Sequence, residues 1–87
     1  MRTKTVEKVH SNSLQVSVYS NNMDELRGEA TVAAVKDELE QHPDYSEIYY
    51  VGRGGNRVPL HELNPSDFTV RSSQSTDEYH VVFSLTM

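Results

Sequence analysis

The chain of 87 residues contains no cysteine, which excludes disulfides, thiolate metal sites and cysteine nucleophiles. No run approaches the roughly 20 apolar residues of a membrane-spanning helix. The first ten residues, MRTKTVEKVH, lack the apolar stretch of a signal peptide. Repeats, low-complexity blocks and linker-like Pro/Gly/Ser stretches are also absent. We therefore expect residues 1–87 to form one small, soluble, cytoplasmic domain with no membrane partner.

Basic residues are also scarce, with eight Lys and Arg against 13 Asp and Glu and a net charge of −5. Binding to phosphate backbones depends on Lys and Arg that displace counterions. The charge balance therefore argues against a nucleic-acid partner and favours another protein. The charge is uneven, because Arg53 and Arg57 flank a glycine-rich turn while the segment DELEQHPD is acidic.

Apolar alternation predicts strands near both ends of the chain. TVEKVH (5–10) and LQVSVYS (14–20) flank a short polar turn and favour a hairpin. The alternative is that LQVSVYS is the first strand and residues 1–13 are an extension. In YHVVFSL (79–85), alternation puts His80, Val82 and Ser84 on one face, and the larger apolar residues on the other. The preceding segment, RSSQSTDE (71–78), is typical of a polar loop.

One helix is predicted over TVAAVKDELEQH (31–42), with Thr31 as its N-cap and Pro43 as the residue that ends it. Its apolar stripe consists of Val32, Val35 and Leu39. The polar segment before it, 21–30, is predicted to be a connector with one helical turn.

A second pair of strands is predicted after the helix. EIYYV (47–51) places Tyr49 on the face opposite Ile48 and Tyr50. RVPL (57–60) is a possible partner strand, which must be short or lie at an edge because Pro59 cannot donate to a ladder. Residues 60–68 indicate a single turn that is irregular or 3₁₀. The order of elements predicts an α+β sheet with one helix across it.

The segment VGRGGNRV contains an Arg-Gly-Gly triplet that admits several functions. It is too far from the C-terminus for a conjugation tail, and a single copy is unlike an RNA-binding repeat. A phosphate loop would need a following Lys-Ser/Thr and a helix. The glycines therefore indicate a turn between two strands.

Several phrases resemble ubiquitin-like proteins: ATVAAVKDEL resembles that family's helix, EIYYVG its third strand, and VPLHELNPSDFTV with YHVVFSL its last segment and strand. The resemblance covers about residues 30–87 and implies a β-grasp fold, with a mixed four- to five-stranded sheet and one helix packed across it. Ubiquitin-like modifiers end in an exposed Gly-Gly tail, whereas this chain ends in FSLTM. We therefore expect an interaction module that is not conjugated.

No catalytic, metal or cofactor site is predicted. The four histidines (His10, His42, His61 and His80) are scattered, and none has a partner at metal-ligand spacing. Serines lack a nucleophile elbow, and acidic pairs such as Asp37 and Glu38 lie on the exposed side of the helix. We expect a protein that is not an enzyme.

The open face of the sheet, away from the helix, is the predicted interaction site. Strand parity brings Tyr49, His80 and Val82 to this face, and the resemblance implies that partners bind there. Arg53 and Arg57 are expected at its rim, where they would steer acidic groups. The alternative is that these side chains are exposed singly, as is common on a solvated face.

Two other functions fit the sequence. One is a small accessory subunit of a multicomponent enzyme of the monooxygenase type. The other is a viral or phage accessory protein that inhibits a host factor, in which the acidic surface could mimic nucleic acid. Self-association through the edge of YHVVFSL would make the chain a homo-oligomer.

Overall fold

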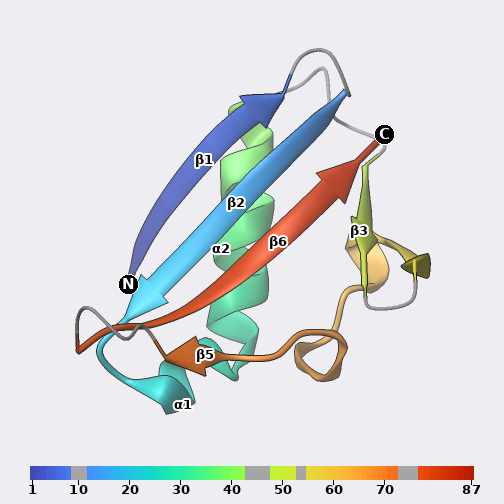
Figure 1. The fold of residues 1–87 in the computed structure, drawn as a ribbon. Coiled ribbons are helices and arrows are strands. Elements are labelled where there is room, and N and C mark those ends of the chain that lie inside the picture. The colour runs from blue at the N-terminus through green and yellow to red at the C-terminus, as the bar shows by residue number, and fades with distance from the viewer. Residues whose placement is uncertain (9–11, 43–47, 53–54, 73–76) are drawn as a thin grey trace.

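The computed structural model describes residues 1–8, 12–42, 48–52, 55–72 and 77–87 (Figure 1). The elements are, in chain order, β1 (Arg2–Lys8), β2 (Ser13–Ser20), α1 (Met23–Leu26), α2 (Glu29–Glu40), β3 (Tyr49–Val51), β4 (Arg57–Pro59), the 3₁₀ turns η4 (Leu60–Glu62) and η5 (Pro65–Asp67), β5 (Arg71–Ser72) and β6 (Tyr79–Thr86). The predicted α+β class is confirmed: one main helix packs across a sheet in a β-grasp-like arrangement.

The strand order in the sheet is β1-β2-β6-β3-β4, and β5 pairs with β6 beyond that path. All the pairings among the described strands are antiparallel, whereas the resemblance implied a mixed sheet. The composition of the hairpin explains the order. The polar strand β1 suits an edge, while β2 carries buried Leu14, Val16 and Val18 and lies beside the equally apolar β6.

Two predicted segments differ in detail from the structure. Residues Arg71 and Ser72, expected in a loop, form β5 against the start of β6. The predicted single turn at 60–68 consists of two 3₁₀ turns, η4 and η5. β4 is three residues long and lies at the end of the sheet, so it is both short and at an edge, either of which a strand with Pro59 allows.

The main helix begins earlier than predicted. Gly28 is the N-cap of α2, and the predicted cap Thr31 lies inside the first turn and is fully buried. Its hydroxyl donates to the carbonyl of Leu26, at 3.0 Å, near the end of α1. The prediction of a Thr31 cap was wrong because part of the polar connector folds into α1. Thr31 is therefore buried at the corner between α1 and α2.

The hydrophobic core lies between the sheet and the two helices. The predicted stripe of α2 (Val32, Val35 and Leu39) is buried, as are the inward residues of β2 and β6. Phe83 stands at the centre. Its ring makes edge contacts with those of Phe68, at 4.9 Å between centroids, and Tyr50, at 5.7 Å.

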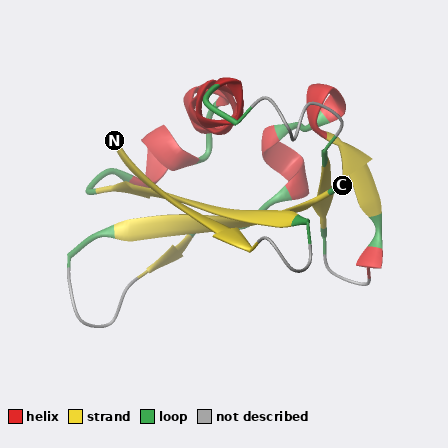
Figure 2. Cartoon of the chain, turned by 90° about the horizontal axis from the view of Figure 1, so that it is seen from above, coloured by secondary structure: helices red, strands yellow, loops and turns green. Residues whose placement is uncertain are grey.

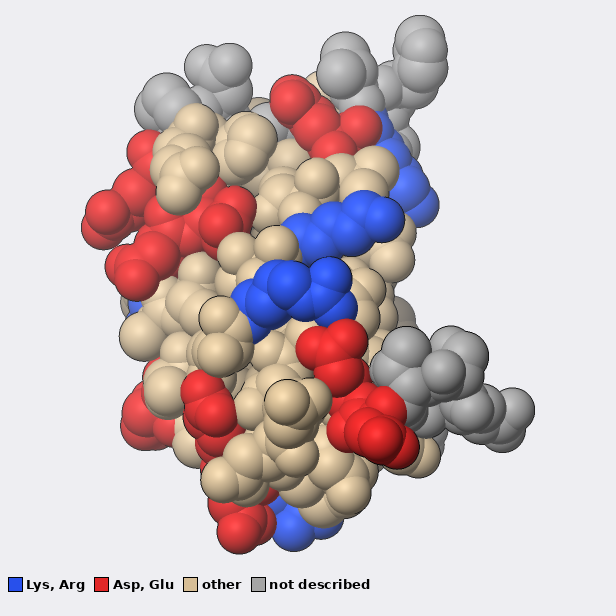
Figure 3. All heavy atoms as spheres, turned by 90° about the vertical axis from the view of Figure 1, so that its left-hand side faces the viewer, with Lys and Arg blue, Asp and Glu red and all other residues tan. Residues whose placement is uncertain are grey.

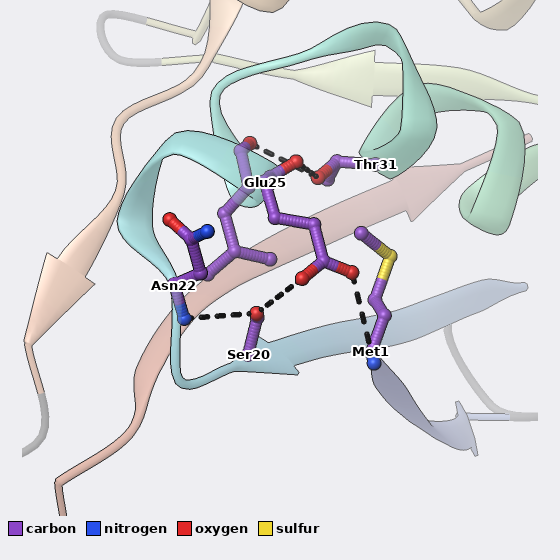
Figure 4. A network of polar contacts seen from close by, with 6 residues as sticks. Met1, Ser20, Asn22, Glu25 and Thr31 are labelled. Atoms are coloured by element: carbon purple, nitrogen blue, oxygen red, sulfur yellow. Dashed lines mark hydrogen bonds and ion pairs between the residues drawn. The ribbon is translucent and has the colours of Figure 1, made fainter.

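Polar contacts fix the corner where β2 leads into α1 (Figure 4). The hydroxyl of Ser20 accepts from the backbone N–H of Asn22 and donates to the carboxylate of Glu25, at 3.1 and 2.9 Å. The terminal ammonium of Met1 lies 3.7 Å from the same carboxylate. Asn22 caps α1 by accepting from the N–H of Asp24.

The glycine segment reverses the chain between the paired strands β3 and β4. The N–H of Gly52 donates to the carbonyl of Asn56, at 2.9 Å, and Gly55 has a φ of +82°, which favours glycine. The predicted turn is confirmed over these residues. Arg53 and Gly54 lie outside the described residues.

Candidate functional site

The sheet has helices on one side only (Figure 2). Seen from above, α1, α2 and both 3₁₀ turns lie on the same side of the long strands, and none of these elements covers the other side. We call this uncovered side the open face. The side chains that strand parity and register assign to it are Arg2, Lys4, Val6 and Lys8 of β1, Ser13, Gln15, Ser17 and Tyr19 of β2, Tyr49 and Val51 of β3, Arg57 and Pro59 of β4, Arg71 of β5, and His80, Val82, Ser84 and Thr86 of β6.

The open face is basic. None of the strand positions just assigned to it carries a carboxylate, and five of them carry Lys or Arg. Lys4, Arg57 and Arg71 are exposed and make no ion pair with other described residues. Arg2 binds Glu78, which lies just before β6, at 2.8 Å. An acidic group approaching this face would therefore meet the side chains of Lys4, Arg57 and Arg71, which no described carboxylate pairs with, while Glu78 already occupies Arg2.

The helix side has the opposite charge. The carboxylates within α1 and α2 are Asp24, Glu25, Glu29, Asp37, Glu38 and Glu40, while Lys36 is the one cation within these two helices. Figure 3 views the molecule from the side of β1. A band of Lys and Arg crosses its middle, and many of the Asp and Glu lie along its left margin, the helix side, while others lie directly below the band and at the top. The strand positions of the open face thus carry the cations, while the two helices carry mostly carboxylates.

The end of the open face near β5 brings together side chains from four strands. Register aligns Arg2, Tyr19, His80 and Arg71 across β1, β2, β6 and β5, and we call these four residues the cross-strand row. The Arg2 guanidinium lies 4.4 Å from the centroid of the Tyr19 ring, and that ring is 6.1 Å from the imidazole of His80. The row combines aromatic area with two guanidinium groups, the composition typical of interface centres.

The structure places the predicted site residues on one face but does not gather them. Tyr49 and Val82 are exposed, at 36% and 40%, and His80 is half-buried. The three side chains lie on the side of the sheet away from the helices, as strand parity predicted. Tyr49 pairs with Thr86, however, six residues along β6 from His80. At the rise of a strand this is about 20 Å. Arg57 lies beyond Tyr49, on β4, and Arg53 is outside the described residues.

Sequence reasoning missed the basic part of this face. Arg2, Lys4 and Val6 alternate along β1, and Val6 is 43% exposed. That alternation was available in RTKTVEK, but the strand was expected to begin only at Thr5. Arg71 could not be found in this way, because its position depends on a two-residue pairing with β6.

A gap in the sheet opens beside β6. β3 pairs with β6 only at Thr86 and Leu85, and β5 only at His80 and Tyr79. The intervening residues, Val81–Ser84, have no described strand on that side. A cleft of about 230 Å³ lies here. We call it the notch; it is lined by Tyr50, Asp67, Phe68, Arg71, Val81 and Val82, among others.

No family model, curated protein or solved structure matches the chain. Within the described ranges, no three potential ligands from His, Asp and Glu lie together in a group that could hold a metal ion. No helix of the described chain is long and apolar enough to span a membrane.

Proposed function

We propose that this protein is a non-catalytic interaction module whose open face binds an acidic surface or segment of another protein. The observation that supports this most directly is charge segregation: the uncovered sheet face is basic although the chain carries a net charge of −5. Complementary charges steer partners and fix their orientation. Tyr49, Val82 and His80 supply apolar and aromatic contact area, and Arg57 extends the basic rim.

A protein partner fits the face better than a nucleic acid. The Arg2 guanidinium stands over the ring of Tyr19, so that ring is not a free stacking platform for a base. The remaining charge of the molecule is strongly acidic and would repel a long phosphate backbone. A short acidic protein segment needs to meet only the basic face.

Two charge-reversal variants test the proposal. Lys4→Glu/Arg71→Glu alters the open face, and Arg27→Glu/Lys36→Glu alters the helix side. All four residues are exposed, and each variant takes the net charge from −5 to about −9, since each reversal adds two negative charges. Partners captured by the parent chain and the helix-side variant, but not by the open-face variant, are the expected result.

A captured partner must then be purified and its contact surface mapped by chemical-shift perturbation. We expect perturbed amides on β1, β2 and β6, and weaker binding by Tyr49→Ala/Val82→Ala. Melting curves of all variants establish that they are folded. A partner that is lost with the helix-side variant and retained by the open-face variant would contradict the proposal.

The acidic helix side supports a second candidate function, in which this face binds a basic protein in place of nucleic acid. The carboxylates on α1 and α2 motivate it, with Asp37 and Glu40 exposed. Asp37→Asn/Glu40→Gln would then weaken capture of a nucleic-acid-binding protein, and raising the salt concentration would do the same. Under the first proposal this variant binds its partner at least as well as the parent chain.

A further inference from the structure

We infer that the notch receives one apolar side chain of the partner, and that Arg71 binds a carboxylate next to that side chain in the partner's sequence. This inference rests on the proposed function, because it assigns the centre of the same binding face. It specifies the partner as an acidic segment that contains an apolar residue flanked by Asp or Glu.

The walls of the notch favour an apolar occupant. Tyr50, Phe68 and Val81 belong to the core and are each at most 9% exposed, whereas Val82 opens onto the outer face. The notch therefore connects the open face with the edge of the core. Its volume of about 230 Å³ is below the range of about 300–1,000 Å³ typical of small-molecule sites, which favours a single side chain over a cofactor.

The backbone of β6 gives the notch polar groups as well. Along an antiparallel strand, successive residues direct their N–H and C=O to alternate sides. Two of the four residues Val81–Ser84 therefore direct these groups away from β2, toward the side on which no described strand pairs with them. An extended partner segment could bond to them while its side chain occupies the cleft, as in strand addition.

The charged residues that line the notch indicate which charge the partner should carry next to its apolar side chain. Asp67 is occupied locally, because its carboxylate accepts from the backbone N–H of Asn64 at 2.9 Å. Arg71 is exposed and makes no ion pair with other described residues. Its planar guanidinium can bind a carboxylate through two parallel hydrogen bonds. Lys4 lies two residues along β1 from Arg2 of the cross-strand row, on the same face, and adds a further positive charge to that face.

Two synthetic peptides of equal charge provide the test. One carries Asp-Leu-Asp at its centre and the other Asp-Ser-Asp, each within the same glutamate-rich heptapeptide with blocked ends. Both are titrated into the isotope-labelled protein and followed by amide chemical shifts. We expect the leucine peptide to bind about fivefold to tenfold more tightly, as burial of its apolar surface implies, and to shift the amides of Val81–Ser84.

Matched variants locate the effect. Val82→Ala should weaken the leucine peptide about threefold to fivefold, because it removes apolar contact area from the notch. Val6→Ala should have little effect, although Val6 is similarly exposed on the same face, at 43% against 40%. Arg71→Gln should weaken both peptides more than Arg57→Gln does, because Arg57 lies on β4, away from the notch.

The possible outcomes separate the two proposals. If both peptides bind the open face equally and leave Val81–Ser84 unshifted, the notch is not an anchor site but the proposed function stands. If neither peptide perturbs the open face, both proposals are overturned. A thymidine octanucleotide is titrated in parallel, and tighter binding of this probe to the same face would overturn the assignment to a protein partner.

Discussion

Single polar residues hold the corner between the helices, and Thr31 has the clearest local role. Its side chain is fully buried, and its hydroxyl donates to the Leu26 carbonyl, a group that α1 cannot satisfy itself. Thr31→Val keeps the shape of the side chain and removes this donor. We expect a loss of about 1 to 2 kcal/mol in the free energy of unfolding, measured by urea denaturation.

Thr69→Val is the matched control for this residue. Thr69 is exposed, so the same substitution should change the free energy of unfolding by less than about 0.5 kcal/mol. Equal effects at both positions would mean that the hydroxyl of Thr31 contributes nothing specific. Thr31 belongs neither to the open face nor to the notch, so Thr31→Val should leave peptide binding unaltered. Thr69 lines the notch, so Thr69→Val is a control for stability alone.

At the scale of elements, the edge strand β1 is held to α2 by one carboxylate. The hydroxyls of Thr3 and Thr5 donate to the two oxygens of Glu38, at 2.9 and 2.8 Å. Glu38→Ala leaves both hydroxyls without this acceptor. We expect a loss of about 1.5 to 3 kcal/mol and faster hydrogen exchange along β1. The control Glu40→Ala, on an exposed position of the same helix, should leave β1 protected; similar exchange in both variants would show that the contact does not hold the edge.

Elements with a local periodic pattern were predictable, and those that depend on pairing were not. The faces of β6 and the stripe of α2 follow from spacing within one segment, and the structure shows both. The antiparallel neighbours β2 and β6 are joined by a pairing between distant segments, which no local pattern specifies. The same applies to the site. Parity alone indicated that Tyr49 and Val82 face outward, but the notch exists because two short strands each cover only two residues of β6.

On the scale of the whole molecule, charge segregation predicts an unusual dependence of binding on salt. The domain measures 33 × 23 × 22 Å, so the acidic helix side is roughly 20 Å behind the open face. At an ionic strength of about 0.01 M the Debye length is about 30 Å, and an acidic partner is affected by both faces. At about 0.1 M it is about 10 Å, and the partner is affected mainly by the basic one.

As the salt concentration rises from about 0.01 M, attraction to the open face and repulsion from the helix side both weaken. The repulsion weakens first because its source is more distant. We expect the dissociation constant of the leucine peptide to change little between about 0.01 and 0.1 M salt and to rise steeply toward about 1 M, where the Debye length is only about 3 Å. Asp37→Asn/Glu40→Gln, which removes two exposed carboxylates from the helix side, should tighten binding at low salt and leave it unchanged at about 0.5 M. Isothermal titration at four ionic strengths measures both curves. If the parent chain instead loses affinity steadily from the lowest salt and the variant follows the same curve, the helix side does not act on the partner, and the net charge of the molecule has no influence on what binds its open face.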